Sequence, residues 1–169
     1  GAAWYLPEER QIVRTEQILD EMCAALGGRA AEKVVFNKIS TGALSDLEKV
    51  TKQARAMVTI YGLNEKIGNL TYYDSAQSDY SFTKPYSEKT AHLIDEEISK
   101  IIEEQYQRAI DILTENKDKL TTLANLLLDR EVIFRDDLEN IFGKRKFKDP
   151  HNSNEEETPL KTENTSPTE

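Results

Sequence analysis

Residues 26–58 read LGGRAAEKVVFNKISTGALSDLEKVTKQARAMV, and this stretch decides the fold of the chain. It holds two helical patterns separated by a loop of small residues, 39–43, in which Gly42 supplies backbone freedom. The second helix is predicted to begin near Leu44 or Ser45, and Gly62 marks its end as a left-handed terminator. Asp46 therefore stands at the start of a helix, directly behind the loop.

A carboxylate at the start of a helix has two interpretations, a stabilising cap or a metal ligand. The first turn carries unpaired N–H groups and partial positive charge, so acidic residues are common there for stability alone. Ser45 and Glu48 also fit a capping box, in which each side chain accepts a hydrogen bond from the other residue's backbone. From spacing alone, the cap is the favoured interpretation of Asp46.

The rest of the chain is also patterned mainly for helices. From about Thr15 apolar residues fall at helical spacing, and Gly27-Gly28 either ends that helix or permits a close packing contact. The longest helix is expected from Ser87 to about Lys117, which is too long for one small core, so it should also pack on a following helix or a neighbouring chain. Shorter helices are expected around 120–128 and 135–142.

Two short segments favour strands. Ala2–Leu6 resembles an edge strand, Leu70–Tyr73 is an aromatic, β-prone run, and residues 74–84 should form an exposed loop. The predicted fold class is therefore mainly α, a helical bundle with one or two short strands.

Composition bounds the domains and the partners. The chain has 169 residues and a net charge of −9, which argues against nucleic acid as a partner. Residues 1–147 are expected to form the folded part, and 148–169, which are polar and acidic, a disordered tail. No apolar run approaches the 18 or more residues that a membrane-spanning helix needs. The single cysteine, Cys23, fits a small buried side chain in a reducing compartment.

Several motifs in order along the chain resemble those of one family. They are GGRAAE at 27–32, STGA at 40–43, DLE at 46–48, ARAMV at 54–58, YGL at 61–63, YSE at 86–88 and IDEE at 94–97. Together they resemble successive landmarks of the FtsH family, and the resemblance fades only near Phe147. FtsH proteins are membrane-anchored, ATP-driven zinc metalloproteases with a mainly helical peptidase domain.

The resemblance implies a zinc site that includes Asp46. In the family, two histidines of a His-Glu-x-x-His helix and a downstream aspartate hold the metal, and Asp46 falls at the position of that aspartate. Three protein ligands leave a fourth position open, at which water is activated. Glu32 is ordinarily a solvent-facing helix residue, but its motif stands near the metal site in the family, so it is a candidate to accept the other ring N–H of a histidine ligand.

This chain lacks the histidine motif. Its histidines are His92, expected to be solvated or capping, and His151, and neither belongs to a His-Glu-x-x-His. In the family that motif lies upstream of the stretch resembling residues 1–9. We therefore expect the chain to begin inside the protease domain, to be inactive alone, and to depend on an upstream glutamate as general base. This sequence contains no Gly-x-x-x-x-Gly-Lys-Ser/Thr, the motif that holds phosphate groups. ATP is therefore expected to bind to an ATPase domain that is absent here.

The resemblance also implies partners and a location. The expected assembly is a homo-hexameric ring with contacts along Ser87–Leu128. The expected substrates are membrane proteins and damaged soluble proteins, and an N-terminal membrane anchor is expected outside this soluble part. The parent protein is expected in the bacterial inner membrane, with this part on the cytoplasmic side. The alternative is a non-catalytic oligomerisation or interaction module derived from the same fold, in which Asp46 is only a helix cap.

Overall fold

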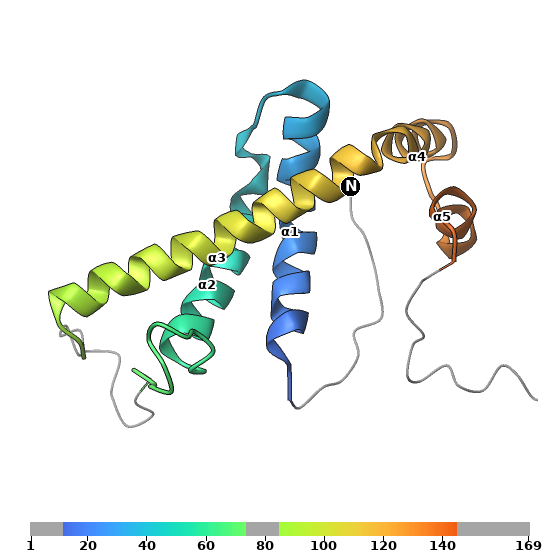
Figure 1. Cartoon of the computed structure of the whole chain (residues 1–169). Coiled ribbons are helices and arrows are strands. Elements are labelled where there is room, and N and C mark those ends of the chain that lie inside the picture. The colour runs from blue at the N-terminus through green and yellow to red at the C-terminus, as the bar shows by residue number, and fades with distance from the viewer. Residues whose placement is uncertain (1–11, 74–84, 145–169) are drawn as a thin grey trace, which may run out of the picture. The chain divides into compact units, whose positions relative to one another are not determined.

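A computed structural model describes residues 12–73 and 85–144 of the chain (Figure 1). Its elements are α1 (Thr15–Phe36), the 3₁₀ turn η1 (Thr41–Ala43), α2 (Leu44–Thr59), α3 (Glu88–Glu115), α4 (Lys117–Arg130) and α5 (Arg135–Phe142). The predicted mainly helical fold is confirmed. The expected strand at Ala2–Leu6 and the expected loop at 74–84 lie outside the described residues.

The β-prone run Leu70–Tyr73 is a loop, and the described ranges contain no strand. Tyr72 pairs with the end of a helix instead of a second strand: its N–H donates to the Thr59 carbonyl over 2.8 Å. Its ring also contacts Tyr86 edge to face, with 4.9 Å between the ring centroids. The aromatic residue that suggested a strand therefore holds the loop after α2 against the start of α3.

Helices α1 and α2 run antiparallel, and α3 lies across both (Figure 1). Helix α1 continues through Gly27-Gly28, so these glycines neither end the helix nor make a close contact. A Cβ on either would meet no atom within 4 Å. The helix ends instead at Asn37, whose left-handed backbone (φ 50°) lets its N–H donate to the Lys33 carbonyl over 3.0 Å.

Substitution of Gly27 by alanine is expected to stabilise the chain. Because alanine restricts the unfolded backbone and meets open space in the helix, Gly27→Ala should raise the free energy of unfolding by about 0.5–1 kcal/mol. Urea unfolding followed by circular dichroism measures this change. Gly62→Ala is the control and should destabilise, since Gly62 has a φ of +63°. Destabilisation by Gly27→Ala would mean that another surface occupies the space above it.

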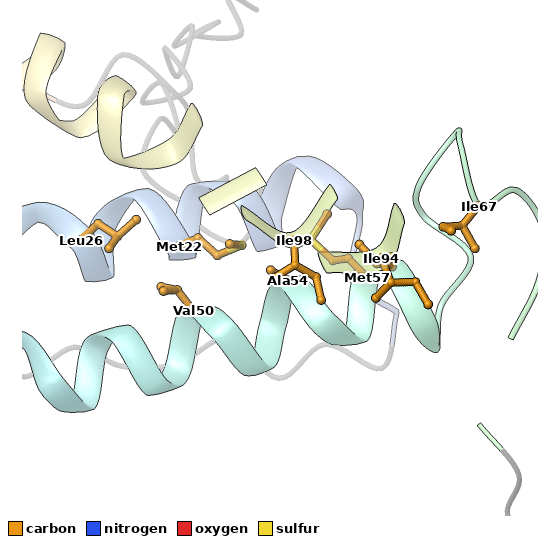
Figure 2. Packing of buried hydrophobic residues seen from close by; sticks show 9 residues of the cluster. Met22, Leu26, Val50, Ala54, Met57, Ile67, Ile94 and Ile98 are labelled. Atoms are coloured by element: carbon orange, nitrogen blue, oxygen red, sulfur yellow. The ribbon is translucent and has the colours of Figure 1, made fainter. Parts of the chain in front are cut away.

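The core lies where α1, α2 and α3 meet (Figure 2). Its buried residues are Met22, Leu26, Val50, Ala54, Met57, Val58, Ile67, Ile94 and Ile98. Helical spacing predicted most of this set. A smaller cluster beside it joins α1 to α3 through Cys23, Ala30 and Ala109. Cys23 is buried as expected, and burial raises the pKa of its thiol.

The helical spacing of Val50, Ala54, Met57 and Val58, continued to Tyr61, predicts that Tyr61 is buried, but its side chain is 61% exposed. Helix α2 ends at Thr59, so the helical period that pointed Tyr61 inward no longer applies. The chain then turns at Gly62, whose positive φ most side chains avoid.

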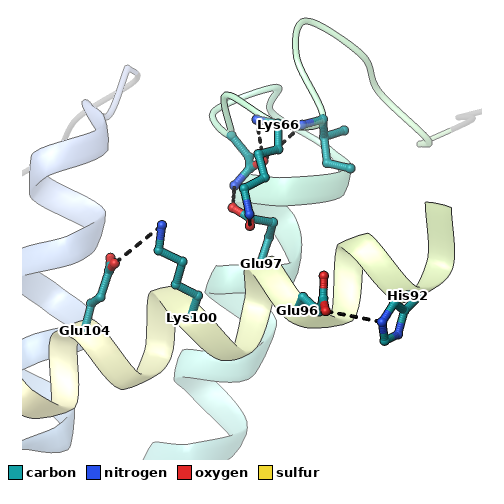
Figure 3. Close-up of polar contacts among 8 residues, drawn as sticks. Lys66, His92, Glu96, Glu97, Lys100 and Glu104 are labelled. Carbon is teal, nitrogen blue, oxygen red and sulfur yellow. Dashed lines mark hydrogen bonds and ion pairs between the residues drawn. The ribbon is translucent and has the colours of Figure 1, made fainter. Parts of the chain in front are cut away.

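A buried carboxylate joins the loop after α2 to α3 (Figure 3). Glu97 on α3 is 5% exposed, although a charged side chain is usually found at the protein surface. It accepts a hydrogen bond of 2.9 Å from the Asn64 side-chain amide and forms an ion pair with Lys66. Asn64 in turn accepts hydrogen bonds from the N–H groups of Lys66 and Ile67. These contacts hold Ile67 in the core.

A second compact unit begins at Asp118 and includes α5 and almost all of α4. Asp137 caps α5 by accepting the Phe134 N–H over 3.0 Å and binds Arg130 over 2.9 Å. Neither α4 nor α5 has a buried residue. Large apolar side chains are exposed on and between them: Leu127, Leu128, Val132, Phe134, Leu138 and Phe142. The expected boundary of the acidic tail, 147/148, lies outside the described residues.

Candidate zinc-ligand site at the start of helix α2

Asp46 lies half-buried in the first turn of α2. The helix follows η1 directly, and its N-terminal flanking residue, Ala43, makes no side-chain capping bond. The predicted capping box is therefore wrong. Ser45 is already inside the helix, and Glu48 bonds to Lys52 one turn later, over 2.7 Å. A 3₁₀ turn in front of a helix shifts the point at which a cap is needed toward the N-terminus.

Ser40 occupies that capping position, and Glu32 binds Ser40 through hydrogen bonds. The Ser40 hydroxyl accepts the Gly42 N–H over 3.3 Å and so caps η1. The same hydroxyl donates to Glu32 Oε1 over 2.7 Å, and the Ser40 N–H donates to Glu32 Oε2 over 2.9 Å. Both oxygens of one carboxylate on α1 thus bind one residue of the loop.

Arg29 contributes a weaker contact to the same residue. Its guanidinium donates to the Ser40 carbonyl over 3.5 Å. The Ser40 hydroxyl, the Ser40 N–H and the nearby Arg29 charge together hold the pKa of Glu32 below its ordinary value. Glu32 is consequently a stable anion at neutral pH. We name Arg29, Glu32 and Ser40 the α1–loop clamp.

The sequence predicted neither Ser40 nor Arg29 as part of the site. The available signal was their position inside GGRAAE and STGA, two of the motifs that carry the family resemblance. Residue spacing could not show that Glu32 and Ser40 meet, because a turn of unpredicted geometry separates them.

The Asp46 carboxylate is free to accept a ligand. Across residues 12–73 and 85–144, no side chain forms a hydrogen bond or ion pair with it. A half-buried carboxylate without a partner suits zinc, which binds aspartate oxygens. Within the same ranges no group of three or more His, Cys, Asp or Glu side chains could hold a metal ion. Among the described residues, Asp46 could therefore supply only one of the ligands that a zinc ion needs.

The other candidate metal ligands lie apart from Asp46. His92 is exposed on the first turns of α3, where it faces Glu96 over 3.2 Å (Figure 3). This is the solvated position expected for it. Cys23 lies in the smaller apolar cluster between α1 and α3. The structure thus brings Glu32 near the loop that leads to Asp46 but brings neither His92 nor Cys23 there.

Comparison with known proteins decides the family. The model of peptidase family M41 matches residues 1–141. The chain belongs to peptidase family M41. The matched residues include the α1–loop clamp and Asp46, together with all of the helices up to Ile141 in α5.

Curated relatives of this M41 chain include proteins named as FtsH proteases and one named as an m-AAA protease component. It is 66% identical over 145 residues to an ATP-dependent zinc metalloprotease FtsH of Parabacteroides distasonis, covering 86% of this chain and 21% of that protein. It is 46% identical over 148 residues to the mitochondrial ATP-dependent zinc metalloprotease FTSH 3 of Arabidopsis thaliana, covering 88% and 18%. The mouse mitochondrial inner membrane m-AAA protease component AFG3L2 is 43% identical over 147 residues, covering 87% and 18%. The chain thus spans about a fifth of the length of these relatives.

The described helices of the M41 chain give no candidate for a membrane span, since none is both long and apolar enough.

Proposed function

We propose that this chain is the C-terminal part of the zinc peptidase domain of an ATP-dependent membrane protease, and that Asp46 is its third protein ligand to zinc. The observation that carries the proposal is the Asp46 carboxylate, half-buried in the first turn of α2 and without a partner in the described residues. A carboxylate that only capped the helix would be expected to bond to a backbone N–H.

Exposed apolar side chains at the α1–α2 junction support the proposal. Phe36 is 70% exposed, Ile39 52% and Leu44 74%, and Leu44 is the first residue of the helix that carries Asp46. Clustered exposed apolar residues usually mark a surface that another protein segment covers. The histidine-bearing half of a peptidase domain is the occupant that this proposal requires.

Each group has a defined role in the proposed site. Zinc, when bound, would supply Lewis-acid chemistry that makes water a nucleophile at neutral pH. Asp46 would hold one coordination position from a rigid helix, and an upstream glutamate would accept the proton from the attacking water. Two histidines from the same upstream segment would complete the ligand set.

The names of the relatives extend the proposal to the whole protein. We expect protein substrates, both membrane-embedded and damaged soluble ones, which an ATPase domain outside this chain unfolds. A membrane anchor outside this chain would place the protein in the bacterial inner membrane, with the present domain on the cytoplasmic side.

A chimera tests the proposed function. This chain would replace the aligned 145-residue segment of the Parabacteroides distasonis protein, whose remaining length supplies the missing parts. The chimera should bind zinc and cleave casein in the presence of ATP, and a chelator should abolish cleavage. The 169-residue chain alone should cleave nothing. A zinc-free chimera, or casein cleavage by the chain alone, would contradict the proposal.

We further propose a homo-hexamer, with ring contacts along Ser87–Leu128. The support is that α4, most of which lies in this range, buries no side chain and exposes Leu127 at 45% and Leu128 at 80%. Such a surface is unfavourable in water unless another surface covers it.

Leu127→Asp should dissociate the hexamer, because it would place a charge in the proposed apolar contact. Sedimentation velocity of the chimera measures its mass, which should fall from six copies to one. Asn125→Asp, which introduces the same charge at an exposed polar position of α4, is the control and should leave the hexamer intact. An unchanged hexamer with Leu127→Asp would refute contacts through this face.

A further inference from the structure

We propose that Glu32 is a positioning residue for Asp46, which acts by holding Ser40 and not by contact with a histidine ligand. The inference rests on the proposed function, because it assumes that Asp46 binds zinc. Glu32 would then not make the hydrogen bond to a histidine ligand that the sequence suggested.

The hydrogen bonds of Glu32 carry the argument. Its two carboxylate oxygens accept separate donors from Ser40, the hydroxyl over 2.7 Å and the backbone N–H over 2.9 Å. Such charge-assisted bonds are about twice as strong as neutral ones, and a bidentate pair also fixes direction. Each oxygen keeps a further lone pair, but both bonds direct the carboxylate toward the loop, so the arrangement favours Ser40 as the partner of Glu32.

Ser40 transmits this constraint to the helix that carries Asp46. Its hydroxyl caps η1 by accepting the Gly42 N–H, and its carbonyl is held by Arg29 over 3.5 Å. Ala43, the last residue of η1, is 7% exposed, and α2 begins at the next residue. Between Ser40 and Asp46 the chain therefore passes through the capped turn η1, the buried residue Ala43 and the start of α2, and no flexible linker separates them.

The clamp also explains why the start of α2 can do without a conventional cap. The flanking residue Ala43 offers no side-chain acceptor, and the Asp46 carboxylate has no partner among residues 12–73 and 85–144. If Asp46 itself capped the helix, its oxygens would be engaged and less available to a metal. By ordering the preceding turn from α1, Glu32 allows Asp46 to remain unbonded at the helix start.

The first arm of the test uses the 169-residue chain without metal. Hydrogen exchange of the Ser40 and Gly42 amides, followed by NMR, reports the clamp directly. Glu32→Gln should speed exchange of both amides at least about tenfold, because a neutral amide side chain has one acceptor oxygen for two donors. Glu48→Gln is the matched control: it removes the same charge from α2, where Glu48 is paired with Lys52. Unchanged exchange with Glu32→Gln would overturn the inference.

The second arm measures zinc affinity of the chimera by competition with a chromogenic chelator. Glu32→Gln should weaken zinc binding about 10–100-fold, the range typical for residues that orient metal ligands. Ser40→Ala should weaken it by a similar factor, and the double variant should be little weaker than either single variant, because both substitutions break the bond between Glu32 and the Ser40 hydroxyl. Ser40→Thr, which keeps the hydroxyl, should restore most of the affinity. Glu48→Gln should bind zinc as the parent does.

The outcomes separate the two proposals. If Asp46→Asn leaves zinc affinity unchanged, the proposed function fails. If Asp46→Asn abolishes binding while Ser40→Ala has no effect, Glu32 does not act through Ser40 and only the further inference fails. Additive losses from Glu32→Gln and Ser40→Ala would likewise overturn it, because they would show that the two side chains act independently.

Discussion

Asp46→Asn in the chimera is expected to weaken zinc binding by more than about 100-fold and to abolish casein cleavage, a larger loss than an outer-shell substitution causes. Asparagine keeps the size of the side chain but replaces an anionic oxygen ligand by a neutral one, which zinc binds weakly. The helix itself should survive, because within the described residues the Asp46 carboxylate accepts no hydrogen bond from the first turn. Only the favourable interaction with the helix dipole, about 0.3–1 kcal/mol, would be lost.

Three measurements make the Asp46 result specific. Bound zinc is counted by elemental analysis, casein cleavage is followed with ATP present, and helical content is read from circular dichroism. Glu48→Gln, two positions along α2, changes the charge equally and should retain both zinc and cleavage. Full zinc occupancy in Asp46→Asn would show that Asp46 is not a zinc ligand and only stabilises the start of the helix. This result would favour the non-catalytic alternative.

Glu97→Gln is expected to lower the free energy of unfolding by about 2 kcal/mol at neutral pH, the range for a lost hydrogen bond to a charged group. Glutamine offers one acceptor oxygen where Glu97 uses two, one toward Asn64 and one toward Lys66. Loss of either contact loosens the loop that holds Ile67 in the core. Glu96→Gln is the control: Glu96 is its exposed neighbour on α3, and the change should cost less than about 0.5 kcal/mol.

The Glu97 contribution should depend on pH in a defined way. Hydrogen bonds from Asn64 and Lys66, with the charges of Lys66 and Lys100, hold the pKa of Glu97 below its ordinary 4.5. The difference in the free energy of unfolding between the parent and Glu97→Gln is therefore largest above pH 4.5. It shrinks as pH falls through the lower pKa that Glu97 has in the folded state. The same pair raises the pKa of Lys66 above its ordinary 10.5, so the difference also shrinks as pH rises beyond that value.

Urea unfolding of both variants between pH 3 and pH 11 measures this difference. A plateau between about pH 5 and pH 10 with a decline on each side is expected. A difference that stayed constant through the acid range would show that Glu97 is not ionised in the folded state.

Much of the fold could be predicted from residue patterns. The spacing of Leu47, Val50, Ala54 and Met57 marked the helix of Asp46, and α5 was predicted with its bounds, because Gly143 ends it. Periodicity reports which face of a helix is buried, so the contributions of α1, α2 and α3 to the core followed. The ordered motifs likewise predicted the family, which the match over residues 1–141 confirms.

Contacts between distant or irregular segments could not be predicted in the same way. Glu97 looked like one of many charged residues on α3, and only the loop that brings Asn64 and Lys66 to it makes burial tolerable. Leu70–Tyr73 has the residues of a strand, but Tyr72 bonds to the end of α2 and no neighbouring strand is present in the described residues.

The sequence by itself determined the helical class, most of the core and the position of Asp46 at a helix start, because these depend on local periodicity and on glycines at which helices end. Only the tertiary structure decided how that start is built. The 3₁₀ turn moved the cap from Ser45 to Ser40, and the folding of α1 against α2 brought Glu32 to Ser40 across eight positions of sequence. A hydrogen bond between residues on two elements depends on their relative placement in space, which spacing along the chain does not contain.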